Sequence, residues 1–207
     1  ARADSSTKWV LSNHDVDRHA TRYGLPDLLE GEESVVGQKW LLDGGSLADV
    51  DVEQGNRRAD ATTMLLLALP GATYLYQGEE LGLHEVGDIA DADRQDPTFF
   101  RSPGVDIGRD GCRVPLPWVA DAQGYGFGSE TPHFPQPTWF ADHAVDVEDR
   151  DPHSTLNLYR QALSLRKRLL TEERLTWEET GSEEVLQFVR PNGWRVIMNF
   201  SKDAVDL

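Results

Sequence analysis

Two short apolar runs and one long apolar stretch organise the first part of the chain. Residues 9–11 (Trp-Val-Leu) stop at a polar segment, and residues 72–76 form a second run that stops at Gln77. Runs of this length and composition predict buried strands. Residues 57–69 predict a helix that is apolar all round in its second half and ends at Pro70. Strand, helix and strand in this order predict a βαβ unit with parallel strands.

The segments around this unit have weaker patterns. Residues 18–26 are expected to form a loop, and residues 49–56 an acidic connector. Ser34 is a candidate cap for a short helix that ends at Leu42, before Asp43 and two glycines. Residues 81–152 show no long periodicity, and a loop region of this length is usually functional.

The period changes in the last third of the chain. Residues 154–170 predict a helix whose buried stripe contains Leu156, Tyr159 and Leu163. Two alternating segments then flank Pro191-Asn-Gly193, which is a strong hairpin signal. An antiparallel β-domain is therefore expected to begin near Leu175.

The charge of the chain limits its partners. The 207 residues carry a net charge of −16 with a pI near 4.6, and the largest basic cluster is Arg166-Lys-Arg168. Such a surface repels nucleic acid and anionic membranes, so neither is expected as a partner. Neutral substrates fit this charge better than phosphorylated ones.

Cysteine content and hydropathy indicate the compartment. Cys112 is the single cysteine, so no internal disulfide forms and a reducing compartment is expected. The N-terminus shows no signal-peptide pattern, and the longest apolar run, residues 64–69, is too short to span a bilayer. These features predict a soluble, cytoplasmic protein.

Polar side chains follow both predicted strands at their carboxyl ends. Ser12-Asn-His-Asp15 and Arg18 come after the first strand, and Gln77-Gly-Glu-Glu80 after the second. In parallel α/β proteins ligands and catalytic groups collect at this end, so the two groups are expected to lie side by side. A carboxylate there can stabilise developing positive charge, and an imidazole can donate to a sugar hydroxyl.

Two other interpretations of the first polar segment stay open at this point. Asn13 and Asp15 can make the hydrogen bonds of an ordinary polar turn. His14, Asp15, Asp17 and His19 can also be read as ligands of a divalent metal ion.

Three motifs together resemble one family, the α-amylase superfamily of glycoside hydrolases (family 13). Ser12-Asn-His-Asp15 followed by Arg18 resembles its signature at the end of the seventh barrel strand. Residues 71–80, Gly-Ala-Thr-Tyr-Leu-Tyr-Gln-Gly-Glu-Glu, resemble its eighth-strand motif. Residues 109–118, Arg-Asp-Gly-Cys-Arg-Val-Pro-Leu-Pro-Trp, are similar to a loop of its α-glucosidase and oligo-1,6-glucosidase branch.

The resemblance implies an α/β fold. Residues 1–172 would be the C-terminal quarter of a (β/α)8 TIM barrel, with its last two βα units and a long loop. Residues 173–207 would begin an antiparallel C-terminal β-domain. On this view the fragment needs the N-terminal barrel portion of its own chain, which holds the nucleophile and the acid, and it is inactive alone.

The resemblance also implies roles for individual residues. Asp15 would be a catalytic carboxylate that stabilises the oxocarbenium-like transition state. His14, Arg18 and Arg109 would bind substrate, with Arg109 clamping the glucose at the non-reducing end. Glu80 would have a structural role and support the residues that touch substrate. No metal and no cofactor are implied.

The expected function is that of a retaining α-glucosidase acting on short α-glucosides such as maltose, isomaltose or sucrose. One alternative is a transglucosidase or a trehalose-forming isomerase of the same family. Another is a non-catalytic relative that uses the fold as a binding module.

Overall fold

The structure, a computed structural model, describes residues 7–26, 36–128 and 131–205. Contacts between residues divide the chain into two compact units. The sheet unit contains residues 1–10, 61–74 and 160–207, and the loop unit contains residues 11–60 and 75–159. The predicted domain boundary after residue 172 lies inside the sheet unit and stays a prediction.

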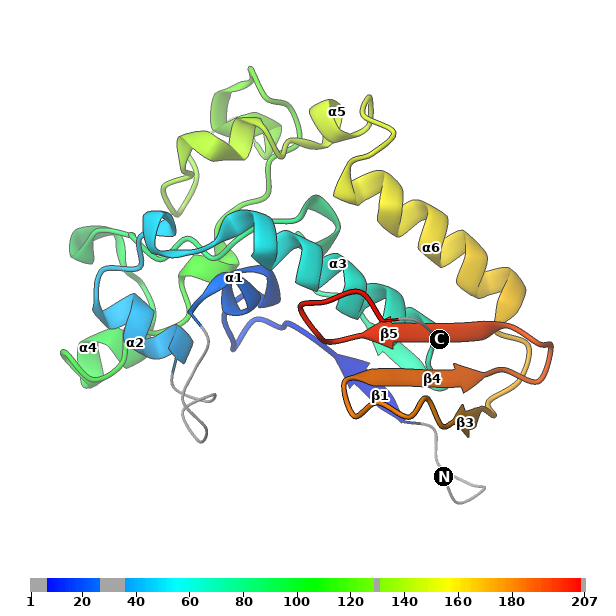
Figure 1. The fold of residues 1–207 in the computed structure, drawn as a ribbon. Helices are drawn as coiled ribbons and strands as arrows, with labels where there is room; N and C mark the ends of the chain where they lie inside the picture. The colour runs from blue at the N-terminus through cyan, green and yellow to red at the C-terminus, as the bar shows by residue number, and fades with distance from the viewer. Residues whose placement is uncertain (1–6, 27–35, 129–130, 206–207) are drawn as a thin grey trace. The chain divides into compact units, whose positions relative to one another are not determined.

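The first two strands of the sheet unit run parallel, as predicted (Figure 1). Strand β1 (Lys8–Val10) pairs with β2 (Ala72–Tyr74), with Trp9 opposite Thr73. The indole Nε1 of Trp9 donates a hydrogen bond to the carbonyl of Pro70 at 2.6 Å. This bond ties β1 to the turn that precedes β2.

Helix α3 (Val52–Ala68) connects the two strands and confirms the predicted helix. It begins at Val52 rather than Arg57, so the acidic connector predicted for residues 49–56 is wrong in its second half. The carboxylate of Asp51 accepts a hydrogen bond from the backbone N–H of Gln54 at 2.9 Å. This N-terminal cap allows the helix to start inside the acidic segment.

The C-terminal part of the sheet unit is an antiparallel sheet of three strands. They are β3 (Thr176–Glu178), β4 (Val185–Val189) and β5 (Arg195–Asn199), in that order across the sheet. The predicted hairpin joins β4 to β5, and Gly193 has the positive φ, 84°, that its turn requires. Phe188 on β4 is fully buried and meets the ring of Trp177 edge to face.

Helix α6 (Thr155–Leu169) agrees with the predicted helix, but its buried face differs. Leu156, Tyr159 and Ala162 are buried, whereas Leu163 is 43% exposed. Leu163 lies one helical turn beyond Tyr159, so its exposure depends on what packs against the helix and not on the helical period. The prediction of Leu163 as a core residue is wrong.

Helix α1 (His19–Gly24) of the loop unit replaces part of the loop predicted for residues 18–26. The backbone N–H of His19 donates to the hydroxyl of Ser12 at 2.9 Å. The first N–H of the helix is thus satisfied by a hydroxyl seven residues upstream, a spacing that the usual capping pattern does not include. Helix α2 (Val36–Leu42) matches the predicted short helix, and its proposed cap Ser34 lies outside the described residues.

The described residues 81–128 and 131–152 are irregular with short helices, as their lack of periodicity predicted. These helices are η2 (Glu79–Leu81), η3 (Asp91–Asp93), α4 (Pro97–Arg101), η4 (Gly111–Arg113), η5 (Gln123–Gly126), η6 (Thr138–Ala141) and α5 (Val145–Glu148), and η1 (Leu47–Asp49) lies earlier in the unit. One apolar cluster lies beneath most of them: Leu81, Leu83, Val86, Ile89, Val114, Leu116, Phe134, Phe140 and Leu156. This core holds the long segment in a defined shape.

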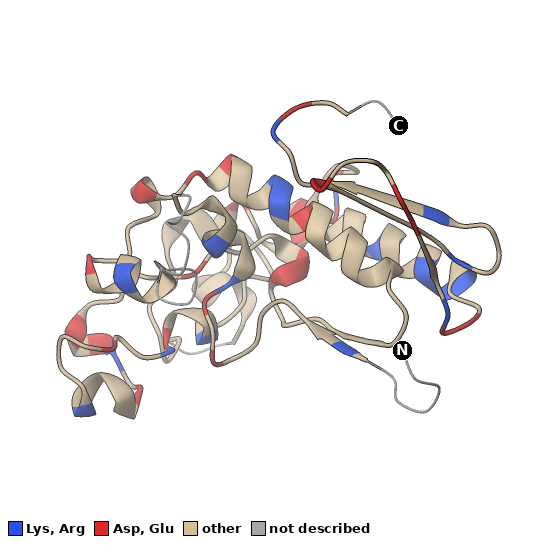
Figure 2. Cartoon of the chain, turned by 60° about the horizontal axis from the view of Figure 1, so that its bottom comes forward, with Lys and Arg blue, Asp and Glu red and all other residues tan. Residues whose placement is uncertain are grey.

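Acidic residues are spread over both units rather than gathered in one patch (Figure 2). None of the described helices is both long and apolar enough to cross a membrane.

Phe140 tests whether this cluster supports the loop unit. Its ring is 2% exposed and lies 4.6 Å from Trp139 and 6.3 Å from Tyr125, centroid to centroid. We expect Phe140→Ala to lower the free energy of unfolding by about 3–5 kcal/mol, because it leaves a cavity. Phe100, which is 60% exposed, provides the control: Phe100→Ala should cost much less. Equal losses in chemical denaturation would show that the cluster is not the core.

Candidate active site

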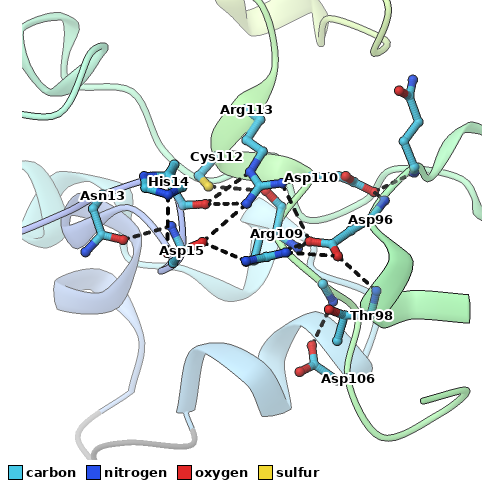
Figure 3. A network of polar contacts seen from close by, with 12 residues as sticks. Asn13, His14, Asp15, Asp96, Thr98, Asp106, Arg109, Asp110, Cys112 and Arg113 are labelled. Atoms are coloured by element: carbon cyan, nitrogen blue, oxygen red, sulfur yellow. Dashed lines mark hydrogen bonds and ion pairs between the residues drawn. The ribbon is translucent and has the colours of Figure 1, made fainter. Parts of the chain in front are cut away.

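The candidate site lies within the loop unit, where three segments meet (Figure 3). The first segment follows β1 and carries Asn13, His14 and Asp15. The second runs into α4 and carries Asp96, and the third carries Arg109 and leads into η4. Sequence analysis predicted His14, Asp15 and Arg109 as members of one site, and the structure brings these three together.

The first segment holds Asp15 in a local turn. The side-chain oxygen of Asn13 accepts a hydrogen bond from the backbone N–H of Asp15 at 2.8 Å. The turn leaves the side chain of Asp15 49% exposed and that of His14 67% exposed, with 3.3 Å between His14 Nε2 and Asp15 Oδ2. The polar-turn interpretation therefore describes the backbone, while the two side chains remain available to a ligand.

Arg109 connects Asp15 to a buried carboxylate. Its Nη1 donates to Asp15 Oδ1 at 2.7 Å, and its Nε donates to Asp96 Oδ2 at 2.7 Å. Asp96 has no exposed side-chain surface, and it also accepts hydrogen bonds from the backbone N–H groups of Arg109 and Thr98. The hydrogen bonds from Arg109 hold the pKa of Asp96 well below its ordinary value, although burial alone would raise it.

Arg113 is a second cation at the site that sequence analysis did not single out. Its Nε and Nη2 donate to the backbone carbonyl of His14 at 3.1 and 2.9 Å. Nη2 also lies 3.4 Å from Asp15 Oδ1, and Nη1 lies 3.8 Å from Asp96 Oδ2. The guanidinium of Arg113 thus binds the backbone of the segment that carries Asp15.

Asp96 is a further site residue that no sequence pattern marked. Its carboxylate is held in place through its own backbone, since Asp110 Oδ2 accepts the N–H groups of Gln95 and Asp96 at 2.8 and 3.1 Å. Residues 93–101 and 108–118 both contain neighbouring Arg and Asp residues, and this was the available signal. It does not show which carboxylate pairs with which arginine.

Arg18 lies beneath the exposed residues rather than among them. It is 3% exposed, and its Nη1 and Nη2 donate to the carbonyls of Gln77 and Cys112 at 3.0 and 3.1 Å. Its guanidinium also lies 5.2 Å from the centre of the Tyr76 ring. Arg18 therefore links the polar segment after β1 to the one after β2.

The two glutamates after β2 have different surroundings. Glu80 Oε2 accepts a hydrogen bond from the backbone N–H of Gly78 at 2.8 Å. Glu79 is 4% exposed, and burial raises its pKa to about 7. His19, whose Nδ1 is 3.9 Å from Glu79 Oε1, has its pKa lowered to about 3 by burial. Near neutral pH this imidazole is therefore uncharged.

A cavity of about 500 Å³ adjoins Asp15 and Arg109. Its other polar lining includes Asp17, Glu85 and Asp106, so it is rich in carboxyl groups. Among the described residues, however, no group of three or more His, Cys, Asp or Glu side chains is arranged to hold a metal ion.

The parallel strand pair defines an α/β protein. Within the loop unit, a carboxylate, an imidazole and two arginines form a polar ligand site. The particular family follows from comparison with known proteins. Residues 44–173, more than half of the chain, match the family model described as "Alpha amylase, catalytic domain". The chain belongs to this family, glycoside hydrolase family 13.

Individual relatives agree with this assignment. The chain is 34% identical to a probable α-glucosidase of Rhizobium meliloti (strain 1021), over 89% of this chain and 29% of that protein. It is 25% identical to an oligo-1,6-glucosidase of Parageobacillus thermoglucosidasius, over 76% of this chain and 26% of that protein. Among solved structures, an α-glucosyl transfer enzyme matches with a TM-score of 0.69 and 34% identity, over 91% of this chain and 30% of that one.

These matches show what share of a family member's length the chain covers. It spans roughly three tenths of the length of the relatives that it matches. The structure therefore corresponds to a fragment of the family's TIM barrel.

Asp96 offers a test of the site that depends on pH. Because the folded pKa of Asp96 lies below its unfolded value, its carboxylate stabilises the fold above pH 4 and loses this effect as the pH falls further. We expect Asp96→Asn to lower the thermal midpoint by several degrees at pH 7. The difference from wild type should shrink below pH 4, because Asp96 of the unfolded chain then takes up a proton while the folded carboxylate is still ionised.

The control for this experiment is Asp121→Asn, because Asp121 is exposed. That variant should differ little from wild type at any pH. A deficit for Asp96→Asn that stayed constant from pH 7 to pH 3 would contradict the proposed ion pair.

Proposed function

We propose that the protein containing this chain is a retaining α-glucosidase that releases glucose from the non-reducing end of short α-glucosides. The observation that carries the proposal is the arrangement at Asp15. This carboxylate is exposed to solvent, fixed by Arg109 and flanked by His14. The names of the matched relatives, α-glucosidase and oligo-1,6-glucosidase, support the same reaction class.

In this proposal Asp15 stabilises positive charge that develops on the sugar ring during bond cleavage. A fixed carboxylate suits this role, because a preorganised charge needs no reorganisation when the transition state forms. Arg109 and Arg113 contact Asp15 and orient it. The other two carboxyl groups that retention requires, about 5 Å apart, would come from segments that the relatives possess outside the matched part.

The remaining residues have supporting roles in this proposal. His14 donates a hydrogen bond to a sugar hydroxyl, and the remaining N–H groups of Arg109, whose side chain is 40% exposed, contact the terminal glucose. Arg18 is too buried to reach the sugar and instead positions the segments that do. Glu80 stabilises the turn after β2 through Gly78.

The strand order supports a particular position for β1 and β2 in the barrel. We propose that β1 and β2 are its last two strands, joined by α3, within residues 1–172. The antiparallel strands β3, β4 and β5 would then open the C-terminal β-domain, which begins near residue 173.

We expect Asp15→Asn to reduce kcat by several orders of magnitude in the full-length protein, because the charge that stabilises the transition state is lost while the shape of the side chain is kept. The measurement is hydrolysis of a chromogenic α-glucoside, with circular dichroism to compare the folds. Asp43→Asn, at an exposed position at the end of α2, is the matched control and should retain full activity. Near-normal activity of Asp15→Asn would remove Asp15 from the catalytic residues.

One alternative has specific support. The α-glucosyl transfer enzyme is 34% identical to this chain, as close as the probable α-glucosidase. A transferase of this kind would use the same Asp15 and Arg109 and differ in the acceptor that attacks the glucosyl group.

The ratio of transferred to released glucose separates the two functions. With maltose as substrate and no added acceptor, we expect free glucose to be the main product, since the proposed enzyme uses water as acceptor. Chromatography of the products at low and high maltose concentration measures the ratio. A majority of oligosaccharide or isomerised products at low maltose would favour the transferase.

A further inference from the structure

Glu85 is a deeply buried carboxyl group beside the candidate active site, and no motif in the sequence marked it. The residue is 2% exposed and follows η2 in the loop unit. Glutamate is almost never fully buried unless its carboxyl group has a partner. The contacts of Glu85 therefore indicate which segments of the chain it positions.

One side of Glu85 faces the segment that carries Asp15. Its Oε2 accepts a hydrogen bond from the backbone N–H of Arg18 at 3.0 Å. Its own backbone N–H donates to the hydroxyl of Thr21, in α1, at 2.7 Å. These two bonds fix the end of the Asp15 segment and the start of α1 to the residues after β2.

The other side of Glu85 faces the segment that carries the two arginines. A Cβ atom placed on Gly111 would lie only 2.5 Å from Glu85 Oε1, so the backbone of η4 packs directly on the carboxyl group. Arg109 precedes Gly111 and Arg113 ends the same short helix. The guanidinium of Arg18, which also bonds the carbonyl of Cys112, completes the link.

We propose that Glu85, as an uncharged carboxylic acid, is a positioning residue that sets the Asp15 segment against the Arg109 segment. The inference rests on the glucosidase function proposed above, because it concerns the same site. Glu85 does not touch the substrate in this proposal. Ionisation of its carboxyl group would place an unsolvated charge between the two segments and disturb their alignment.

The charged surroundings of Glu85 agree with an uncharged acid. Burial is the main cause that raises its pKa, to about 8, and Asp17 in the neighbouring segment raises it further. Arg18 and Arg22 oppose this shift. Cys112 in η4 brings no charge near neutral pH, since burial raises the pKa of its thiol to about 12.

The test compares Glu85→Gln with wild type in the full-length protein from pH 6 to pH 9. Glutamine keeps an oxygen that accepts the Arg18 N–H and cannot ionise. We expect similar kcat/KM values at pH 6, and a ratio of variant to wild type that rises about tenfold between pH 7 and pH 9. The ratio cancels the titration of every acid or base that both proteins share.

Two further variants complete the experiment. Glu85→Ala removes the acceptor and should lower kcat at least about tenfold at every pH with little change in KM, because misplaced catalytic groups slow the reaction step. Glu183→Gln, at an exposed surface position, is the matched control, and its ratio to wild type should not change with pH. A flat ratio for Glu85→Gln would overturn the proposal.

Thermal unfolding provides a readout that does not depend on the reaction. A raised carboxyl pKa means that the folded protein binds more protons than the unfolded chain between about pH 4.5 and pH 8. Wild type should therefore lose stability relative to Glu85→Gln as the pH rises through this window, and the difference should level off above it.

This readout separates the two proposals. If wild type does not hydrolyse α-glucosides, the proposed function fails and the unfolding data decide the role of Glu85. Glu85→Gln should then be increasingly more stable than wild type up to pH 8, and Glu85→Ala less stable than Glu85→Gln at pH 6. The absence of either difference would overturn the inference.

Discussion

The candidate site depends on one constraint, which is that the buried carboxylate of Asp96 must be paired. A carboxylate without exposed surface is costly unless hydrogen bonds and an opposite charge surround it. Asp96 meets this requirement through the side chain and backbone of Arg109 and the N–H of Thr98. Once Arg109 is fixed in this way, one nitrogen remains directed at Asp15.

The site is built in two levels. Asp15 and His14 are exposed and can meet a ligand, whereas Arg18 and Glu85 are buried and bind backbone groups. The buried residues bind main-chain groups, so they set the positions of the segments and do not contact a ligand themselves. Because buried polar groups are costly when unpaired, displacement of one segment would leave several buried groups without hydrogen-bond partners at once.

Family membership and geometry answer different questions about this protein. The match over residues 44–173 assigns the chain to the α-amylase family but does not include Asp15. The contacts among Asp15, Arg109 and Asp96 show how residues on both sides of that limit form one site. Since the fold alone does not define a reaction, the assignment of function rests on these contacts together with the relatives.

The sequence by itself determined the elements whose signals are local. The parallel strand pair, the helix between the strands, the β4–β5 hairpin and the motif residues His14, Asp15 and Arg109 all follow from short patterns. Tertiary structure decided the features that depend on distant partners. Arg18 binds the carbonyls of Gln77 and Cys112, which lie far from it in the sequence, and the exposure of Leu163 depends on what packs against α6. The roles of Asp96, Arg113 and Glu85 likewise arise because an ion pair or a buried acid is defined by what surrounds it in space, and residues far apart in the sequence supply those surroundings.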